Sequence, residues 1–103
     1  MSDQRLLENC AVEVLSDRGT PLYGTDECDV RFEGDQLVIS YWDDEGAVVF
    51  GGLLHDDGRW ELWCRSRPVR AVLRRSADGR RLEGTWRNDE ANGSWWIELP
   101  DGP

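Results

Sequence analysis

The sequence contains no lysine, and all twelve of its basic residues are arginine. The absence of lysine excludes amine nucleophiles, Schiff-base chemistry and the phosphate-binding lysine of Walker-type loops. Histidine occurs once, as His55, where a predicted strand meets a turn. His55 could pair with Cys64 or with a serine, but no motif surrounds these residues. We therefore expect a protein that is not an enzyme and has no catalytic residues.

Cysteine is scarce and follows no motif. Cys10, Cys28 and Cys64 are odd in number and widely spaced, and no two of them form a CxxC pair. This pattern is typical of neither a disulfide framework nor a zinc site. One disulfide could form in an oxidising compartment. Three buried thiols are favoured, because free cysteine behaves as a small apolar residue.

Long apolar runs are also absent, and none approaches the length of a membrane span. The first ten residues, MSDQRLLENC, lack the basic start and the apolar core of a signal peptide. We therefore expect a cytoplasmic protein with no membrane partner. The 103 residues are enough for one domain with its own core, and we assign residues 1–103 to it.

Acidic residues form three runs, at 26–29, 43–45 and 56–57. Clustered carboxylates can bind Ca²⁺ or Mg²⁺, but no run has the alternating ligands and closing glutamate of an EF-hand loop. All three runs lie in or beside predicted turns, where aspartate caps backbone amides. We therefore expect no metal site and no cofactor.

Turn signals recur about every dozen residues, which is typical of short antiparallel strands in a barrel or sandwich. Asp57-Gly58, Asp78-Gly79 and Asn92-Gly93 are among them, and such pairs favour the tight turns of β-hairpins. The segments between the turns alternate between apolar and polar residues, which predicts strands. The predicted strands cover residues 28–33, 37–42, 47–54, 59–65, 69–75, 81–87 and 94–99.

The start of the chain is ambiguous. Leu6, Leu7, Cys10 and Val14 fit one face of a helix, whereas Cys10, Val12 and Val14 fit one face of a strand. We predict a short helical turn over residues 3–9, followed by a strand over residues 10–15.

These elements predict an all-β protein with at most one short N-terminal helix. An antiparallel meander of about seven to eight strands is best closed into a small up-and-down barrel, because closure removes exposed edges. A two-sheet β-sandwich is the alternative. The last hairpin, LEGTW followed by NGSWWIEL, resembles hairpins of the calycin-like barrels, the lipocalin and avidin group. The resemblance implies a small barrel and brings no functional residues with it.

Neighbouring residues of a strand point to opposite faces, so Trp95 and Trp96 cannot both enter the core. Trp95 shares its face with Ile97 and Leu99, and we predict that it is buried. Trp96 is then an outward aromatic side chain that needs a cover or a partner, and Trp63 has the same status on its own strand.

Residues 37–42 and 47–54 are apolar on both faces, so we expect both faces of these strands to be covered. The N-terminal segment could supply part of that cover through Leu6 and Leu7. The pair Gly51-Gly52 inside a strand predicts a bulge or a sharp coil.

Charge is distributed unevenly along the chain, whose net charge is −9. Residues 1–63 carry fifteen acids and four arginines, whereas residues 64–103 carry six acids and eight arginines. The later arginines, with aromatic side chains beside them, could bind single-stranded nucleic acid. The net negative charge opposes this, and ion pairs of Arg81 or Arg87 with Glu98 would neutralise the arginines instead.

We therefore expect a small acidic binding module that engages another protein, or a second copy of itself, through its outer face. Inhibitor, immunity and adaptor proteins are of this type, and aromatic and arginine side chains are the usual anchors. The candidate interface residues are Trp63, Trp96, Trp42, Arg65 and Arg87. The candidate acidic face, which would attract a basic partner, comprises Asp43, Asp44, Glu45, Asp56 and Asp57. The alternatives are a carrier of a small hydrophobic ligand in the barrel interior and nucleic-acid binding through the Arg65–Arg87 face.

Overall fold

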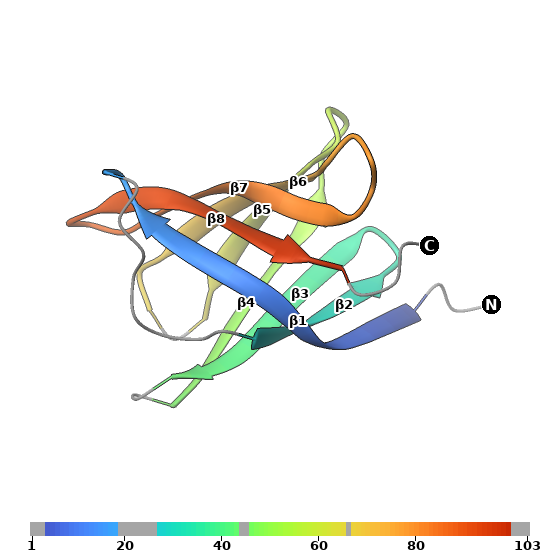
Figure 1. Cartoon of the computed structure of the whole chain (residues 1–103), viewed down its shortest axis with the longest axis horizontal. Coiled ribbons are helices and arrows are strands. Elements are labelled where there is room, and N and C mark those ends of the chain that lie inside the picture. The colour runs from blue at the N-terminus through green and yellow to red at the C-terminus, as the bar shows by residue number, and fades with distance from the viewer. Residues whose placement is uncertain (1–3, 19–26, 44–45, 66, 100–103) are drawn as a thin grey trace.

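The structure is a computed structural model that describes residues 4–18, 27–43, 46–65 and 67–99. These residues form eight antiparallel strands and no helix, closed into a small barrel (Figure 1). The strands are β1 (Gln4–Ser16), β2 (Glu27–Glu33), β3 (Gln36–Asp43), β4 (Gly46–Leu54), β5 (Arg59–Cys64), β6 (Arg70–Arg75), β7 (Arg81–Arg87) and β8 (Asn92–Glu98). The predicted all-β barrel is confirmed, and the strands predicted after residue 27 differ only at their ends.

Strand β1 closes the barrel because it pairs with two partners. Its residues 4–11 pair with β2, and its residues 12–16 pair with β8. Each of the other pairings joins strands that are consecutive in sequence. The architecture is therefore an up-and-down barrel and not a two-sheet sandwich.

The predicted helical turn over residues 3–9 is wrong, because β1 is extended from Gln4 onward. A bulge between Leu7 and Cys10 explains the error. Within it, Asn9 has a φ of 56°, and its backbone N–H donates a hydrogen bond of 3.1 Å to Oδ1 of Asp29. The extra residue of the bulge turns both Leu7 and Cys10 to the inner face. Inward residues therefore stand three apart, as they would on a helix.

The inner faces of the strands fill the barrel with apolar side chains, as the alternation predicts. The buried residues are Leu7, Cys10, Cys28, Val30, Leu37, Ile39, Val48, Phe50, Trp60, Leu62, Ala71, Leu73, Leu82, Trp95, Ile97 and Leu99. The prediction that Trp95 is a core residue is confirmed, and its ring centroid lies 5.4 Å from that of Phe50. Trp86 is partly buried against this core, and its Nε1 donates a hydrogen bond of 3.1 Å to the carbonyl of Leu15.

Gly51 and Gly52 do not form a bulge, because the pairing of β4 with both neighbours continues through them. A Cβ atom on Gly52 would overlap the carbonyl oxygen of Glu61 on β5. Gly84 on β7 approaches the carbonyl oxygen of Val72 on β6 in the same way. These close approaches of two backbones let the short strands coil tightly enough to close the barrel.

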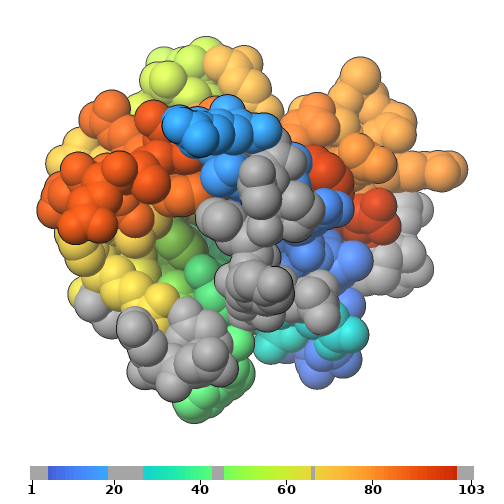
Figure 2. All heavy atoms as spheres, turned by 60° about the vertical axis from the view of Figure 1, so that its left-hand side comes forward, coloured from blue at the N-terminus to red at the C-terminus, as the bar shows by residue number. Residues whose placement is uncertain are grey.

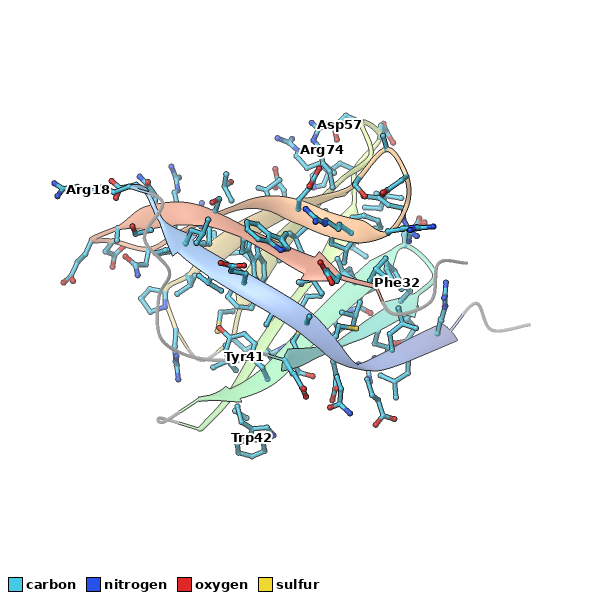
Figure 3. The ribbon with its side chains drawn as sticks, viewed as in Figure 1. Arg18, Phe32, Tyr41, Trp42, Asp57 and Arg74 are labelled. Atoms are coloured by element: carbon cyan, nitrogen blue, oxygen red, sulfur yellow. The ribbon has the colours of Figure 1, made fainter. Side chains whose placement is uncertain are left out.

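The expectation that β3 and β4 are covered on both faces is wrong for the outer face. Trp42 and Leu53 are 76% and 62% exposed, and in Figure 3 Trp42 projects from the end of β3. The N-terminal segment supplies no cover, because β1 is itself a wall of the barrel, with Leu7 buried and Leu6 exposed. The described strands form one closed layer, and no other described residues form a second layer outside it.

Candidate binding groove on the outer face

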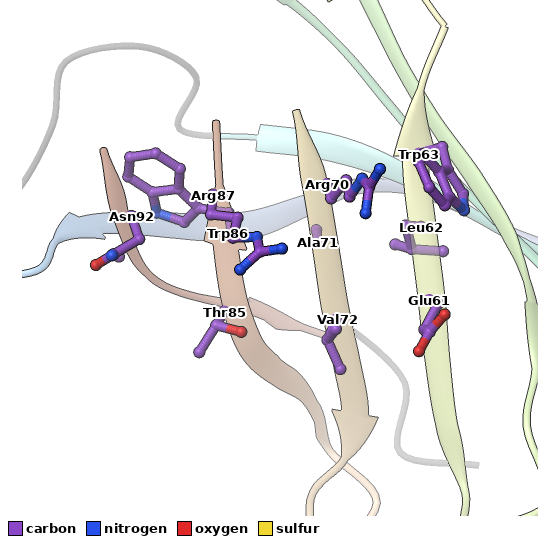
Figure 4. A pocket seen from close by; sticks show the side chains of 11 residues that line it. Glu61, Leu62, Trp63, Arg70, Ala71, Val72, Thr85, Trp86, Arg87 and Asn92 are labelled. Carbon is purple, nitrogen blue, oxygen red and sulfur yellow. The ribbon is translucent and has the colours of Figure 1, made fainter. Parts of the chain in front are cut away.

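A hollow with a volume of about 430 Å³ lies on the outer face of strands β5–β8 (Figure 4). One row of its side chains consists of residues that stand directly opposite one another across the strands, in the order Trp63, Arg70, Arg87 and Asn92. A second row beside it consists of Glu61, Val72 and Thr85. We call this hollow the Arg70–Arg87 groove.

The alternation along each strand places these side chains outside the barrel. Leu62 and Ala71 are buried in the core, so their neighbours in sequence point outward. Because their own side chains point inward, Leu62 and Ala71 line the floor of the groove through their backbones. Val72 adds an apolar side chain to the second row, between Thr85 and Glu61 (Figure 4).

Arg70 stacks on Trp63 at one end of the row. The guanidinium carbon of Arg70 lies 4.0 Å from the centroid of the indole, which is 51% exposed. A stacked guanidinium keeps its N–H groups in the plane of the stack, where they can still reach a carboxylate. The contact therefore orients Arg70 without using its hydrogen-bond donors.

Arg70 and Arg87 stand directly opposite each other on β6 and β7. Like charges in this position destabilise a sheet. Among the described residues, neither arginine has a carboxylate within ion-pair distance. Although the net charge of the chain is −9, two adjacent cations thus have no acidic partner within the described ranges.

Other arginines of the same face have partners on the chain itself. Arg74 lies 3.7 Å from Asp57, and Figure 3 shows the two side chains together at one end of the barrel. Arg81 lies 3.8 Å from Glu98, which confirms the predicted cross-strand pair for Arg81. Two arginines of the predicted cationic face that lie outside the groove are therefore paired with carboxylates of the chain itself.

Arg70 and Arg87 also border a smaller hollow of about 210 Å³, lined by Pro68, Arg70, Arg87, Asn88 and Asp89. The segments after β5 and after β7 lie next to each other here, in yellow and orange in Figure 2. Oδ1 of Asn88 accepts hydrogen bonds of 2.8 Å from the backbone N–H groups of Glu90 and Ala91, which orders the turn. Arg70 and Arg87 thus form a ridge that is accessible from both sides.

Glu61 is the one acidic side chain among the described residues that line the groove. It lies 3.3 Å from Nη2 of Arg59 and 3.5 Å from Nε2 of His55. Glu61 therefore interacts with the turn after β4, and Arg70 and Arg87 dominate the charge of the groove.

The structure brings only some of the predicted interface residues together. Trp63 and Arg87 line the groove, whereas Trp42 lies at the end of β3 and Arg65 lies just beyond β5. Trp96 on β8 is half-buried, with the guanidinium carbon of Arg81 5.7 Å from the centroid of its ring. Arg81 thus contributes to the cover of Trp96.

The predicted acidic face is described only in part. Asp56 and Asp57 are exposed in the turn between β4 and β5, where Asp57 lies 3.4 Å from Nε of Arg59. The side chain of Asp43 and the residues Asp44 and Glu45 lie outside the described part of the chain.

Arg70, Val72, Thr85 and Asn92 were not among the predicted interface residues. Alternation identified three of them as outward, but it gives no pairing between strands, so it could not select them. The sequence predicts a turn at Asn92, because Asn-Gly is a strong hairpin signal. In the structure Asn92 begins β8 directly opposite Arg87.

Cys10 and Cys28 stand opposite each other inside the barrel, on β1 and β2. Burial, followed by the negative charge of Asp29, raises the pKa of Cys10 to about 11. Burial, followed by the nearby Cys10 and Asp29, raises the pKa of Cys28 to about 12. Both thiols are therefore protonated at neutral pH and are poor nucleophiles.

Within the described ranges, no three side chains of histidine, cysteine, aspartate or glutamate come together as metal ligands. The same ranges contain no helix that is long and apolar enough to cross a membrane. Comparison of the chain with known protein families, curated proteins and solved structures found no match.

Proposed function

We propose that this protein is a non-enzymatic binding module that engages another protein through the outer face of β4–β7. One observation carries the proposal: an exposed tryptophan, Trp63, stands beside two arginines without an acidic partner among the described residues. Tryptophan and arginine are enriched among the residues that anchor protein interfaces. The groove brings both kinds of anchor to one place.

The surface next to Trp63 supports an apolar contact. Gly51 on β4 stands directly opposite Trp63 and has no side chain to fill the space beside the indole. A Cβ atom on Gly51 would meet nothing closer than 4.0 Å. Leu53, two residues along β4, is exposed. A partner that covers Trp63 and Leu53 gains about 25 cal/mol for each Å² of apolar surface that it removes from water.

Two other functions have less support. Nucleic-acid binding would use the Arg65–Arg87 face, but Arg74 and Arg81 lie against the chain's own carboxylates, and the net charge of −9 repels a polyanion. A carrier needs space inside the barrel, where large aromatic side chains such as Trp60 and Trp95 are buried.

The first experiment locates the contact. A photo-crosslinking amino acid replaces Leu53 beside the groove, and in a control protein it replaces Ala11, an exposed residue of β1. We expect a crosslinked protein at position 53 that is absent at position 11 and is lost when Trp63→Ala is added. Sedimentation of the protein alone shows whether the partner is a second copy.

The second experiment measures how much Trp63 contributes to the affinity for the partner. The identified partner is titrated against Trp63→Ala and against Trp42→Ala, an exposed tryptophan outside the groove. We expect Trp63→Ala to weaken binding by about 2 kcal/mol, or roughly 30-fold, with little change in the urea midpoint. Trp42→Ala should leave the affinity and the urea midpoint unchanged. A loss of binding with Trp42→Ala alone would move the contact to the end of β3, and no loss with either would refute the proposal.

A further inference from the structure

We infer that the Arg70–Arg87 groove takes an extended segment of the partner in which two carboxylate side chains alternate with small neutral residues and an apolar side chain follows. The inference rests on the proposed function and gives the partner of the groove a chemical identity.

The two guanidinium groups of the groove do not point at one spot. In Figure 4 the Arg87 side chain leans from β7 toward β6, and the Arg70 side chain leans from β6 toward Trp63 on β5. Neighbouring strands are about 4.8 Å apart, so the two charges are offset by roughly one strand. Two separate carboxylates fit this arrangement better than one phosphate group, whose oxygens surround a single phosphorus atom.

The length of the row matches the distance spanned by three side chains on one side of an extended chain that crosses the strands. The row continues from Arg87 through Arg70 and Trp63 to Gly51 on β4. It crosses three strand intervals, or roughly 14 Å. Side chains on one side of an extended chain recur about every 6.7 Å, so three of them span roughly 13 Å. The first meets Arg87, the second meets Arg70, and the third covers the space over Gly51 beside Trp63.

The charges of the groove favour carboxylates at the first two positions. Arg70 and Arg87 repel each other in the free protein, and each can offer a pair of N–H groups to a carboxylate. Arg70 can do so while it stays stacked on Trp63. The net charge of −9 acts against an acidic ligand at long range, so short ion pairs carry the affinity and added salt weakens it.

Labelled peptides test this inference in fluorescence anisotropy titrations. One probe carries Glu-Ser-Glu-Ser-Leu between glycines, and a second carries the same residues in reverse order, so that both chain directions are covered. The control is the isomer Glu-Glu-Ser-Ser-Leu, because adjacent side chains of an extended chain point to opposite sides. We expect saturable binding of one ordered probe, at least tenfold tighter than that of the isomer and weaker at higher salt.

Charge exchange then tests which carboxylate meets which arginine. Arg87→Glu should abolish binding of the better probe, and lysine in place of the glutamate farther from leucine should restore it. Arg70→Glu should be rescued by lysine in place of the other glutamate, and the crossed combinations should not bind. Arg31→Gln on β2 is the control, because Arg31 lies 3.6 Å from Glu33 outside the groove, and it should bind as the natural protein does.

Three outcomes would overturn the inference: no saturable binding at millimolar peptide, equal binding of the isomer, or rescue in the crossed combinations. Tighter binding of a peptide with one phosphoserine, or of an oligothymidylate, would overturn it as well. If Trp63→Ala still weakens the natural partner in that case, the proposed function stands and the acidic segment is wrong. If it does not, both are wrong.

Discussion

At the scale of single residues, two adjacent indoles have different environments. Trp95 is buried against Phe50 in the core, whereas Trp96 lies on the outer face beside Arg81. The alternation of strand residues was enough to assign the buried one, because its neighbours on the same face are Ile97 and Leu99. The cover of Trp96 could not be predicted, since Arg81 belongs to another strand.

Trp95→Ala should lower the free energy of unfolding by about 3–5 kcal/mol, because it leaves a large cavity in the core. Trp96→Ala should cost less than half as much, because the indole is only half-buried and Arg81 can follow it into solvent. Urea unfolding monitored by circular dichroism measures both. Equal losses would show that the outer face around Trp96 is packed as tightly as the core.

The two opposed thiols make stability depend on alkaline pH. Burial raises the pKa of both Cys10 and Cys28 above the usual value of 9.0, so the folded state holds their protons more tightly than the unfolded state does. The contribution of these thiols to the free energy of unfolding is fully present below pH 9. It is lost as the pH rises toward their folded-state pKa values of about 11 and about 12.

We expect the free energy of unfolding, from urea titrations at pH 8 to 11, to fall with pH above about 9. The double variant Cys10→Ala, Cys28→Ala should show a smaller fall, because it lacks both thiols whose pKa is raised by burial. An equal slope in the double variant would show that these thiols do not titrate differently in the two states.

At the scale of elements, the sequence predicts seven strands because turn signals bound each of them and alternation supports those with one polar face. The prediction for the start of the chain, a helical turn over residues 3–9, is wrong because turn signals and alternation disagree there. The bulge at Asn9 adds one residue, so the alternation changes phase without a turn signal and imitates a helical face. A hydrogen bond to Asp29, twenty residues away, completes the bulge, and no local pattern reveals such a partner.

The glycine pair of β4 gives a matched test of close backbone approach. Gly52→Ala places a methyl group on the carbonyl oxygen of Glu61 and should cost about 3 kcal/mol or more of the free energy of unfolding. Gly51→Ala adds the same group where the nearest atom is 4.0 Å away, and it should change stability by less than about 1 kcal/mol. Urea midpoints of the two variants decide this. Similar losses would show that β4 tolerates no side chain at either position.

At the scale of the whole molecule, the candidate site depends on which outward residues the strand pairing brings together. Trp42, Trp63 and Trp96 follow the same local pattern, yet only Trp63 lies in the groove. The register opposes Arg70 to Arg87 and leaves both without a described acidic partner, while other arginines pair with carboxylates. Register is set by packing over the whole barrel, so the sequence identifies two residues that line the groove, Trp63 and Arg87, but not the others.

The double pairing of β1 has a consequence for the order in which the chain folds. Seven of the eight strand pairings join neighbours in sequence, and such contacts cost little loop entropy. The eighth pairing brings Val12 opposite Ile97. It can form only after β8 has been synthesised. Of the eight strands, β1 leaves the ribosome first, and its pairing is completed last. During synthesis its residues 12–16 keep an unpaired edge that a chaperone or a second nascent chain can reach.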